Sequence, residues 1–396
     1  MPTIWNNRAP ASSSLHPASP SRRPATAVSA HSIPAVHPGR AAGLVLLIGG
    51  PVSACLLGAT GTSAMATIAA AGQPATTAPA VTAHATRQHP TNARRLVWVR
   101  YDRTRNSAGL VVGDVDGSHQ RQLTRPGHGE FDNEPVRSPD GSRVLLDREH
   151  ADGTVQIGLV AVRGGPTRFV DTGCVDPCFT DAGPGWMPDG KHLTFVRVVG
   201  PFDPVTGDAV SALQYTERLD GSDLRLLSVP GDYEDNGIRF APGGRYLVLV
   251  RDQYIHGVLH FAIFRMRSDM THVRRLTPWA LDADRPSVSP ARTGPTAGLV
   301  AFETNGGGSP TQGDVALLPL WCRNVAACTR GTRYVTHNTG TTKTSYAASW
   351  SPQGRRLAFA EEDGTNVDIY TIRPDGSHRR QVTHSPVPEY SPAWSQ

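Results

Sequence analysis

Acidic residues are missing from the first 101 residues of this 396-residue chain, the first of them being Asp102. Six of the 39 basic residues, all arginines, precede residue 95, so 33 remain in the rest of the chain against all 34 acidic residues. The formal net charge of +5 therefore comes from the N-terminal segment. It does not indicate nucleic-acid binding by the folded part, and we expect no nucleic-acid partner.

Signatures of catalysis are also missing. The chain has no Gly-x-Ser-x-Gly elbow, His-Glu-x-x-His pair, glycine-rich phosphate loop or complete EF-hand pattern, so serine hydrolase, zinc protease and nucleotide chemistry have no support. The ten histidines from His119 to His384 lack ligand spacing. The acidic residues of Asp114 to Gly117 are better explained by a hairpin turn than by calcium. We therefore predict a protein that is not an enzyme and has no cofactor and no bound metal.

The N-terminal segment has the composition of a leader. Residues 1–40 combine Pro, Ser, Ala and His without apolar periodicity, which predicts disorder. An apolar stretch from Leu44 follows Arg40, in the order of a secretory signal peptide. Lysine is nearly absent, with only Lys191 and Lys343, a bias typical of a GC-rich bacterial genome. The sequence therefore indicates a bacterial protein that is exported.

The segment Val52 to Cys55 resembles a bacterial lipobox, which makes Cys55 the preferred lipidation site. Cleavage further on or an uncleaved anchor are the alternatives. We expect a leader with a signal-peptide-like or lipobox segment over 1–55, an Ala/Thr-rich linker over 56–94, and one folded domain over 95–396. Contact with a membrane is expected only through the N-terminal lipid or anchor.

Four of the five cysteines form two closely spaced pairs. Cys174 and Cys178 enclose three residues, and Cys322 and Cys328 enclose five. Neither pair has the Cys-x-x-Cys spacing of a zinc site. In an oxidising compartment each pair closes a local disulfide loop, which supports an extracytoplasmic location, as a cell-envelope lipoprotein or a secreted protein.

A unit of about fifty residues repeats through the rest of the chain. Its clearest copy is Trp350 to Phe359, in which a strand ends at a Pro-x-Gly turn and a second strand alternates apolar and polar residues. Other copies begin at Arg137, Trp186, Phe240 and, in degraded form, Val288. Each leads into a second hairpin with an Asp-Gly or Gly-Gly turn or a degraded equivalent. Four strands per unit are typical of a propeller blade.

Six units fit the chain. The first apolar residues of their second strands are spaced by 48 to 57 residues. These anchors are Leu96, Val144, Leu193, Leu247, Val300 and Leu357. Residues 392–395 resemble a first strand without its turn, whereas residues 95–99 resemble a second strand without a first. We predict that the two chain ends complete one blade, which removes exposed sheet edges.

These repeats resemble the TolB-type β-propeller, which is related to the WD-repeat class. The resemblance covers residues 95–396 and implies an all-β fold of six four-stranded antiparallel blades. It does not determine the function. The same fold serves as a partner-binding scaffold, as the N-terminal gate of prolyl-oligopeptidase-type peptidases and as the body of some polysaccharide lyases.

Each repeat copy begins at what we call its Trp position, and the incomplete last unit has Trp394 there. One set of mostly acidic residues recurs five positions before the Trp position. The set is Asp132, Asp181, Asp235 and Glu389, with Ser345 in one copy and Ala283 between Asp282 and Asp284 in the degraded copy. The strand order implied by the resemblance would place these positions around one mouth of the central channel. We expect a rim of concentrated negative charge that binds a cation or a basic partner segment. The alternative is that each acid caps its strand by accepting backbone N–H bonds.

Two functions remain open from the sequence. The favoured one is an exported, non-catalytic binding or scaffold protein that presents a propeller face to a protein or peptide partner and acts as a monomer. The alternative is a carbohydrate-active propeller, either an enzyme of the polysaccharide lyase kind or a sugar-binding protein.

Overall fold

The computed structural model of the protein describes residues 95–394, apart from 201–210, 229–233, 257 and 305–312. The predicted leader and linker, with Cys55, lie outside the described residues. In the described part of the chain, no helix is both long and apolar enough to cross a membrane. The secondary structure there consists of 24 strands and two short helices.

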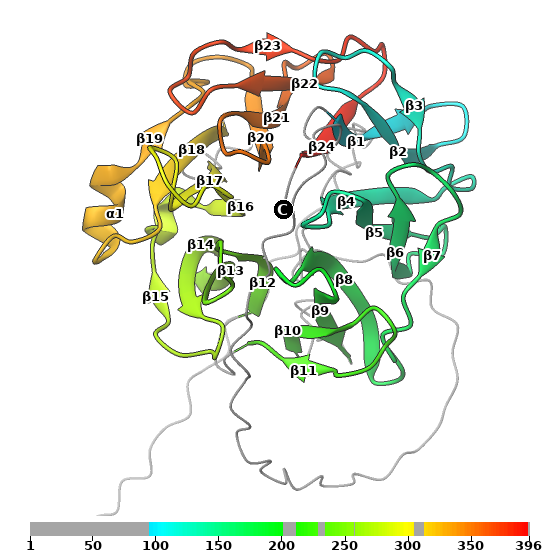
Figure 1. Ribbon diagram of the computed structural model, residues 1–396, viewed down its shortest axis with the longest axis horizontal. Helices are drawn as coiled ribbons and strands as arrows, with labels where there is room; N and C mark the ends of the chain where they lie inside the picture. The colour runs from blue at the N-terminus through cyan, green and yellow to red at the C-terminus, as the bar shows by residue number, and fades with distance from the viewer. Residues whose placement is uncertain (1–94, 201–210, 229–233, 257, 305–312, 395–396) are drawn as a thin grey trace, which may run out of the picture. The chain divides into compact units, whose positions relative to one another are not determined.

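The strands form six four-stranded antiparallel blades around a ring (Figure 1), as the repeats predict. Blade 1 contains both chain ends, and it shares one parallel pairing, Ala108 with Phe131, with blade 2. The innermost strands of blades 1 to 6 are β24 (Glu389–Ala393), β4 (Phe131–Arg137), β8 (Cys178–Trp186), β12 (Glu234–Phe240), β16 (Ala283–Val288) and β20 (Thr344–Trp350).

Two further strands lie outside each innermost strand. The second strands of blades 1 to 6 are β1 (Arg95–Asp102), β5 (Arg143–Glu149), β9 (His192–Val199), β13 (Tyr246–Ile255), β17 (Leu299–Thr304) and β21 (Leu357–Glu362). The third strands are β2 (Ser107–Asp114), β6 (Val155–Ala161), β10 (Ser211–Arg218), β14 (Val258–Arg267), β18 (Asp314–Pro319) and β22 (Val367–Ile372).

The outermost strand of every blade has only two residues, and the first is always an arginine. These strands are β3 (Arg121–Gln122), β7 (Arg168–Phe169), β11 (Arg225–Leu226), β15 (Arg274–Arg275), β19 (Arg333–Tyr334) and β23 (Arg380–Gln381). A short edge with a charged residue is a poor template for pairing with another chain. The six blades therefore end in edges that resist aggregation.

Tryptophans at the ends of the innermost strands join neighbouring blades. Trp186 and Trp350 are fully buried. Each donates its indole N–H to a carbonyl of the preceding blade's innermost strand, Trp186 to Val136 and Trp350 to Ser287, both at 3.0 Å. A buried indole N–H needs such an acceptor, so the bond fixes the position of each blade against its neighbour.

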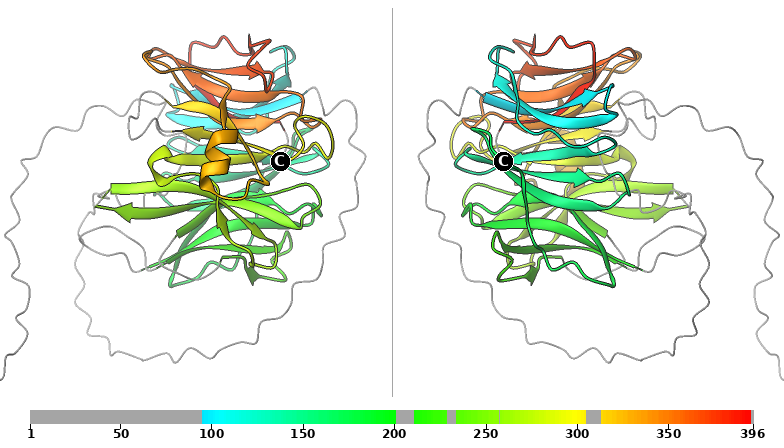
Figure 2. Two further views of the ribbon diagram at one scale, coloured as in Figure 1. Left: turned by 90° about the vertical axis from the view of Figure 1, so that its left-hand side faces the viewer. Right: turned by 90° about the vertical axis from the view of Figure 1, so that its right-hand side faces the viewer.

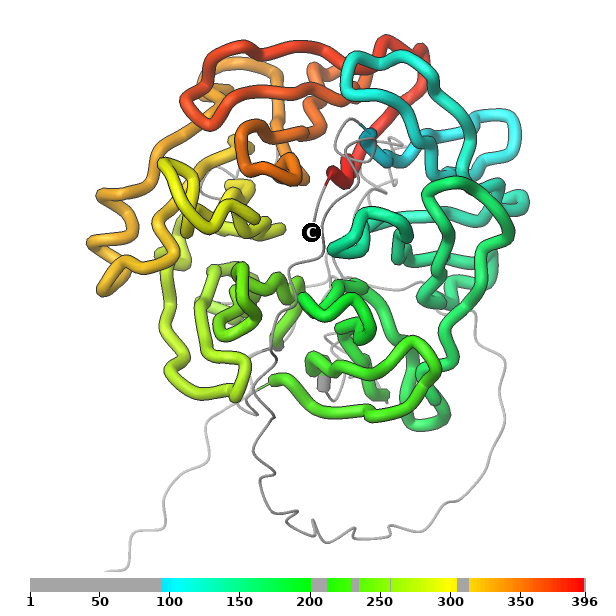
Figure 3. Tube along the Cα trace, viewed as in Figure 1, coloured from blue at the N-terminus to red at the C-terminus, as the bar shows by residue number. Residues whose placement is uncertain are grey.

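The chain ends pair with each other, as predicted. Strand β24 lies antiparallel to β1, with Val97 opposite Ala393 and Arg100 opposite Glu389, and the trace in Figure 3 shows the red C-terminal strand beside the cyan start of the described chain. At the junction of blades 1 and 2, Arg137 occupies the position at which other repeats have a tryptophan. Its guanidinium donates to the Trp394 carbonyl at 3.1 Å and so links blades 1 and 2.

One element departs from the expected all-strand pattern. A seven-residue helix, α1 (Val325–Gly331), begins within the segment closed by Cys322 and Cys328 and ends beyond it, on the outside of blade 5 (Figure 2). Its N-cap is Asn324, whose side chain accepts a bond from the Ala327 N–H at 2.9 Å. A short 3₁₀ turn, η3 (Trp279–Leu281), precedes β16.

Candidate functional site

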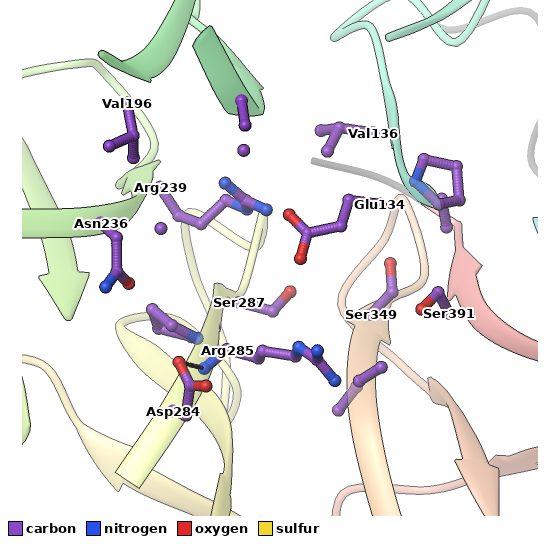
Figure 4. Close-up of a pocket in the computed structure, with 18 of the residues that line it drawn as sticks. Glu134, Val136, Val196, Asn236, Arg239, Asp284, Arg285, Ser287, Ser349 and Ser391 are labelled. Carbon is purple, nitrogen blue, oxygen red and sulfur yellow. Dashed lines mark hydrogen bonds between the residues drawn. The ribbon is translucent and has the colours of Figure 1, made fainter. Parts of the chain in front are cut away.

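A cavity lies on the axis of the propeller, where the innermost strands of all six blades meet (Figure 4). Its volume is about 160 Å³, and its lining combines apolar residues with five charged ones. These are Glu134 from β4, Asp235 and Arg239 from β12, and Asp284 and Arg285 from β16.

The lining is built by the same irregularity in every innermost strand. Three residues before each Trp position, the backbone adopts a positive φ, and all six strands shift register beside it. These residues are Glu134 (φ 47), Gly183 (65), Gly237 (61), Arg285 (46), Ala347 (53) and Ser391 (48). Only two are glycines, so four side chains stand in a conformation that costs about 1–3 kcal/mol each. Bulges that re-aim side chains in this way are common beside binding sites.

Glu134 and Arg285 occupy equivalent bulges in opposite blades, three blades apart, and Arg239 enters from blade 4 (Figure 4). Arg285 is held in place. Its backbone N–H donates to Asp284 at 2.6 Å, and its guanidinium lies 3.7 Å from Glu303 of β17. By contrast, neither Glu134 nor Arg239 forms an ion pair with another described residue. In the described structure, the Glu134 carboxylate and the Arg239 guanidinium therefore face the cavity without an ion-pair partner, although Arg239 donates to the Ile238 carbonyl at 2.9 Å.

The charged groups of the cavity are strongly perturbed. Burial raises the pKa of Glu134, although Arg285 and Arg239 oppose the shift. Burial lowers the pKa of Arg239, which nearby carboxylates only partly offset. Burial would also lower the pKa of Arg285, but the charges of Glu303, Glu134 and Asp284 outweigh burial and raise that pKa. Water is thus scarce here, and charges of a ligand would interact strongly with these groups.

Two further acids accept hydrogen bonds from the backbone of the bulges. Asp147 of β5 accepts the Gly183 N–H at 2.9 Å, and Glu303 accepts the Ala347 N–H at 2.8 Å. Burial raises the pKa of both, that of Asp147 well above its usual range. Because each acid binds the bulge of the next blade, these side chains have a structural role in shaping the cavity.

Three of the predicted rim acids form buried salt bridges. Asp132, Asp181 and Asp235 are at most 3% exposed. Each receives two hydrogen bonds from an arginine of the second strand in its own blade. The pairs are Asp132 with Arg148 (2.5 and 2.9 Å), Asp181 with Arg197 (2.9 and 2.7 Å) and Asp235 with Arg251 (2.6 and 3.2 Å). The expected concentration of free negative charge is therefore not found at these positions.

The other rim acids are also engaged. Glu389 is fully buried and accepts the Trp98 indole N–H at 2.8 Å and the Arg100 side chain at 2.5 Å. Asp282 lies 2.8 Å from His260 Nδ1. Asp235 and Asp284 are the members of the set that line the cavity. Partner or cation binding by these acids stays a prediction, but most of them can take part only through rearrangement of existing pairs.

Sequence reasoning missed the arginine partners, although a signal for them exists. Each follows its aspartate by 16 residues in three separate repeats. It also missed Glu134 and Arg239, because the bulge that turns them toward the axis leaves no composition signal: its six residues are of five different types.

The two expected cysteine pairs lie at disulfide distance, with sulfur atoms 1.97 Å apart for Cys174–Cys178 and 1.81 Å apart for Cys322–Cys328. Within the described residues, one group has ligand atoms close enough for a metal, namely Cys174, Cys178 and Asp181. Its sulfurs are bonded to each other and the Asp181 carboxylate is bonded to Arg197. These atoms are therefore occupied by other interactions.

A buried carboxylate outside the cavity gives a pH prediction. Glu217 of β10 is fully buried, and neither of its carboxylate oxygens has a hydrogen-bond partner. Burial, followed by the charge of Asp181, raises its pKa to about 7. Because the unfolded side chain titrates near ~4.3, the folded state binds the proton more tightly, and stability falls as the pH rises from about 4.5 through about 7.

Replacing this residue in Glu217→Gln should remove that loss. The free energy of unfolding gained by the variant should grow by about 2–3 kcal/mol between pH 5 and pH 8. Denaturant unfolding of both proteins across this range measures the difference. Parallel pH profiles for the two proteins would contradict the assignment.

Comparisons with known proteins agree with this architecture. No protein-family model matches the chain. A stretch of 55 residues is 34% identical to the Tol-Pal system protein TolB of Anaeromyxobacter dehalogenans, covering 14% of this chain and 13% of that protein. The crystal structure of TolB from Acinetobacter baumannii has a TM-score of 0.57 at 17% identity, over 76% of this chain and 66% of that one.

Two further structures are similar over most of the chain. A putative TolB from Agrobacterium tumefaciens has a TM-score of 0.50 at 19% identity, over 73% of this chain and 88% of that one. Hydrazine synthase from Kuenenia stuttgartiensis has a TM-score of 0.58 at 12% identity, over 76% of this chain and 46% of that one. Proteins of different function thus share the fold. The described part of this chain is a TolB-like six-bladed β-propeller.

Proposed function

We propose that the protein is an exported, non-catalytic binding protein that receives a segment of a protein or peptide partner at the axial cavity. The observation that carries this proposal is that two charged side chains, Glu134 and Arg239, face a cavity built by all six blades without an ion pair in the described structure. Unpaired charges in a poorly hydrated site are costly, and a ligand with opposite charges offsets that cost.

The size and chemistry of the cavity favour a peptide segment. A volume of about 160 Å³ holds one or two side chains and not a folded domain. Because both signs of charge are present, a segment with an acidic and a basic residue is the best match. The description of a related sequence as a Tol-Pal system protein is consistent with a role in a protein assembly.

The alternative, a carbohydrate-active propeller, has less support at this site. The described residues that line the cavity include no histidine. Its carboxylates, Glu134, Asp235 and Asp284, lie beside arginines, an environment suited to fixed charges. A lyase would release unsaturated products from acidic polysaccharides, which ultraviolet absorbance detects. Such a release would contradict a purely binding role.

The compartment is part of the proposal. It comprises export by the leader, lipidation at Cys55 and a monomeric state. The two disulfide-distance pairs support an oxidising environment.

Site-specific photocrosslinking in the native host tests the proposal. A photoreactive residue at Asn236, which lines the cavity, should capture a defined protein, whereas one at Ser222, in an exposed turn, should not. The adduct should disappear in Glu134→Gln with Arg239→Gln, because the charged anchors are lost. Mass spectrometry identifies the adducts. Absence of an adduct at Asn236, or the same adducts from both positions, would contradict the proposal.

A further inference from the structure

A second surface, on the outside of blades 4 and 5, gathers positive charge around two aromatic rings. We name it the basic aromatic patch. Its residues come from the start of β13, from β14 and β15, and from the segment that leads into α1 (Figure 2, left). They are Arg245, Tyr246, Arg265, Arg267, Arg274, Trp321 and Arg323.

The aromatic rings form the centre of the patch. Tyr246 and Trp321 meet edge to face, with centroids 4.9 Å apart, and Trp321 is 54% exposed. The Arg265 guanidinium lies 5.7 Å from the Tyr246 ring and 5.2 Å from the Trp321 ring. Arg245 and Arg267 lie within 6.0 Å of the Tyr246 ring. Aromatic faces thus hold the guanidinium groups at fixed places.

The charge of the patch is not neutralised within the described structure. None of its five arginines forms an ion pair with a described carboxylate. The acid nearest in sequence, Asp269, accepts bonds from the backbone N–H and hydroxyl of Thr271. Burial and the charge of Arg274 lower the pKa of Arg265. Because five like charges repel one another, a bound anion would stabilise this arrangement.

A groove adjoins the patch and extends it. Its volume is about 400 Å³, and it runs between β15 and the start of α1. Arg274, Arg275 and Arg323 line it together with Phe264 and Trp279, and its described lining includes no acid. The groove therefore has the same combination of arginine and aromatic side chains, which lengthens the surface available to a chain-like ligand.

The disulfide pair makes the patch rigid. Cys322 lies between Trp321 and Arg323, and its bond to Cys328 joins them to α1. Arg274 donates to the Arg323 carbonyl at 2.5 Å, and Arg265 donates to the Leu320 carbonyl at 2.6 Å, so blade 4 also anchors this segment. A surface that is already ordered loses less conformational entropy on binding.

From this geometry we infer that the basic aromatic patch and its groove bind an acidic polysaccharide. Guanidinium groups match carboxylates in a two-pronged geometry, and the exposed face of Trp321 suits the apolar face of a sugar ring. A nucleic acid offers similar charge, but disulfides indicate a compartment in which polysaccharides are the usual polyanions. This site is separate from the axial cavity and does not depend on the peptide-binding proposal.

Calorimetric binding of oligogalacturonate to the full chain tests the inference. Binding should be measurable at low salt and weaken as salt rises, whereas a neutral maltooligosaccharide of equal length should not bind. Arg245→Gln with Arg323→Gln should weaken binding about 10-fold, because two exposed charges are lost. Trp321→Ala should weaken binding to the oligogalacturonate but not to inorganic polyphosphate, a polyanion without sugar rings.

The matched control is Arg163→Gln with Arg218→Gln, which removes two exposed arginines from blades 2 and 3. It should bind within about two-fold of the parent protein. A melting curve confirms that each variant is folded. An equal loss in the control pair, no loss in the patch pair, or equal or tighter binding of a thymidine oligonucleotide would overturn the inference.

Discussion

Ending the chain after Pro388 is expected to unfold the whole propeller. The truncation removes β24, whose five residues are all buried, and the buried Trp394. It exposes the edge of β1 and leaves the Trp98 indole N–H without Glu389. The loss should reach about 5 kcal/mol or more, which is comparable with the total stability of an ordinary domain.

Thermal denaturation followed by circular dichroism measures this effect. The control ends the chain after Trp394, so it keeps every described residue of the last strand, and it should melt within a few degrees of the parent. If the chain ending after Pro388 melted at the same temperature as this control, closure by the two ends would not be needed for folding.

Removing one member of a buried Asp–Arg pair is expected to cost about 3–5 kcal/mol. The best case is Asp235→Ala, because Asp235 is 1% exposed and Arg251 is 6% exposed. Burial raises the pKa of Asp235 even though Arg251 opposes the shift. The intact pair therefore adds little stability of its own, but loss of one partner leaves the other charge buried.

A double-mutant cycle separates these effects. Asp235→Ala should destabilise strongly, whereas adding Arg251→Met should recover much of the loss, because no buried charge then remains. The control is Asp116→Asn, in an exposed turn that asparagine also satisfies, with a change of about 0.5 kcal/mol or less. Additive losses in the cycle would show that the pair is not coupled.

Regular features of the fold were predictable from the sequence, because each has a local cause. The Asp-Gly turns at Gly117 and Gly141 have the positive φ that such turns require. Their aspartates accept the N–H two residues on, at 3.0 Å in both cases. The alternation of apolar and polar residues predicts strands with one buried face. The incomplete units at the two chain ends predict the pairing of β24 with β1.

The candidate site was less predictable, because its geometry depends on contacts between distant residues. The position of Asp132 is predictable from the repeat, but its salt bridge to Arg148 in the adjacent strand depends on how the strands pair. Glu134 lies only two residues further on, and a bulge turns it toward the axis. The bulges carry residues as different as glycine, glutamate and arginine, so no residue type marks them.

The pairing of the two ends also bears on how the protein folds. Trp98 and Glu389 are 291 residues apart in the sequence, yet they share a hydrogen bond. Contacts of such separation form late and slow folding, because a long loop must close first. Blade 1 can be completed only when nearly the whole chain has been synthesised, and until then the β1 edge has no partner. We therefore expect the nascent protein to be most sensitive to proteases and to edge-to-edge association before its last strand arrives.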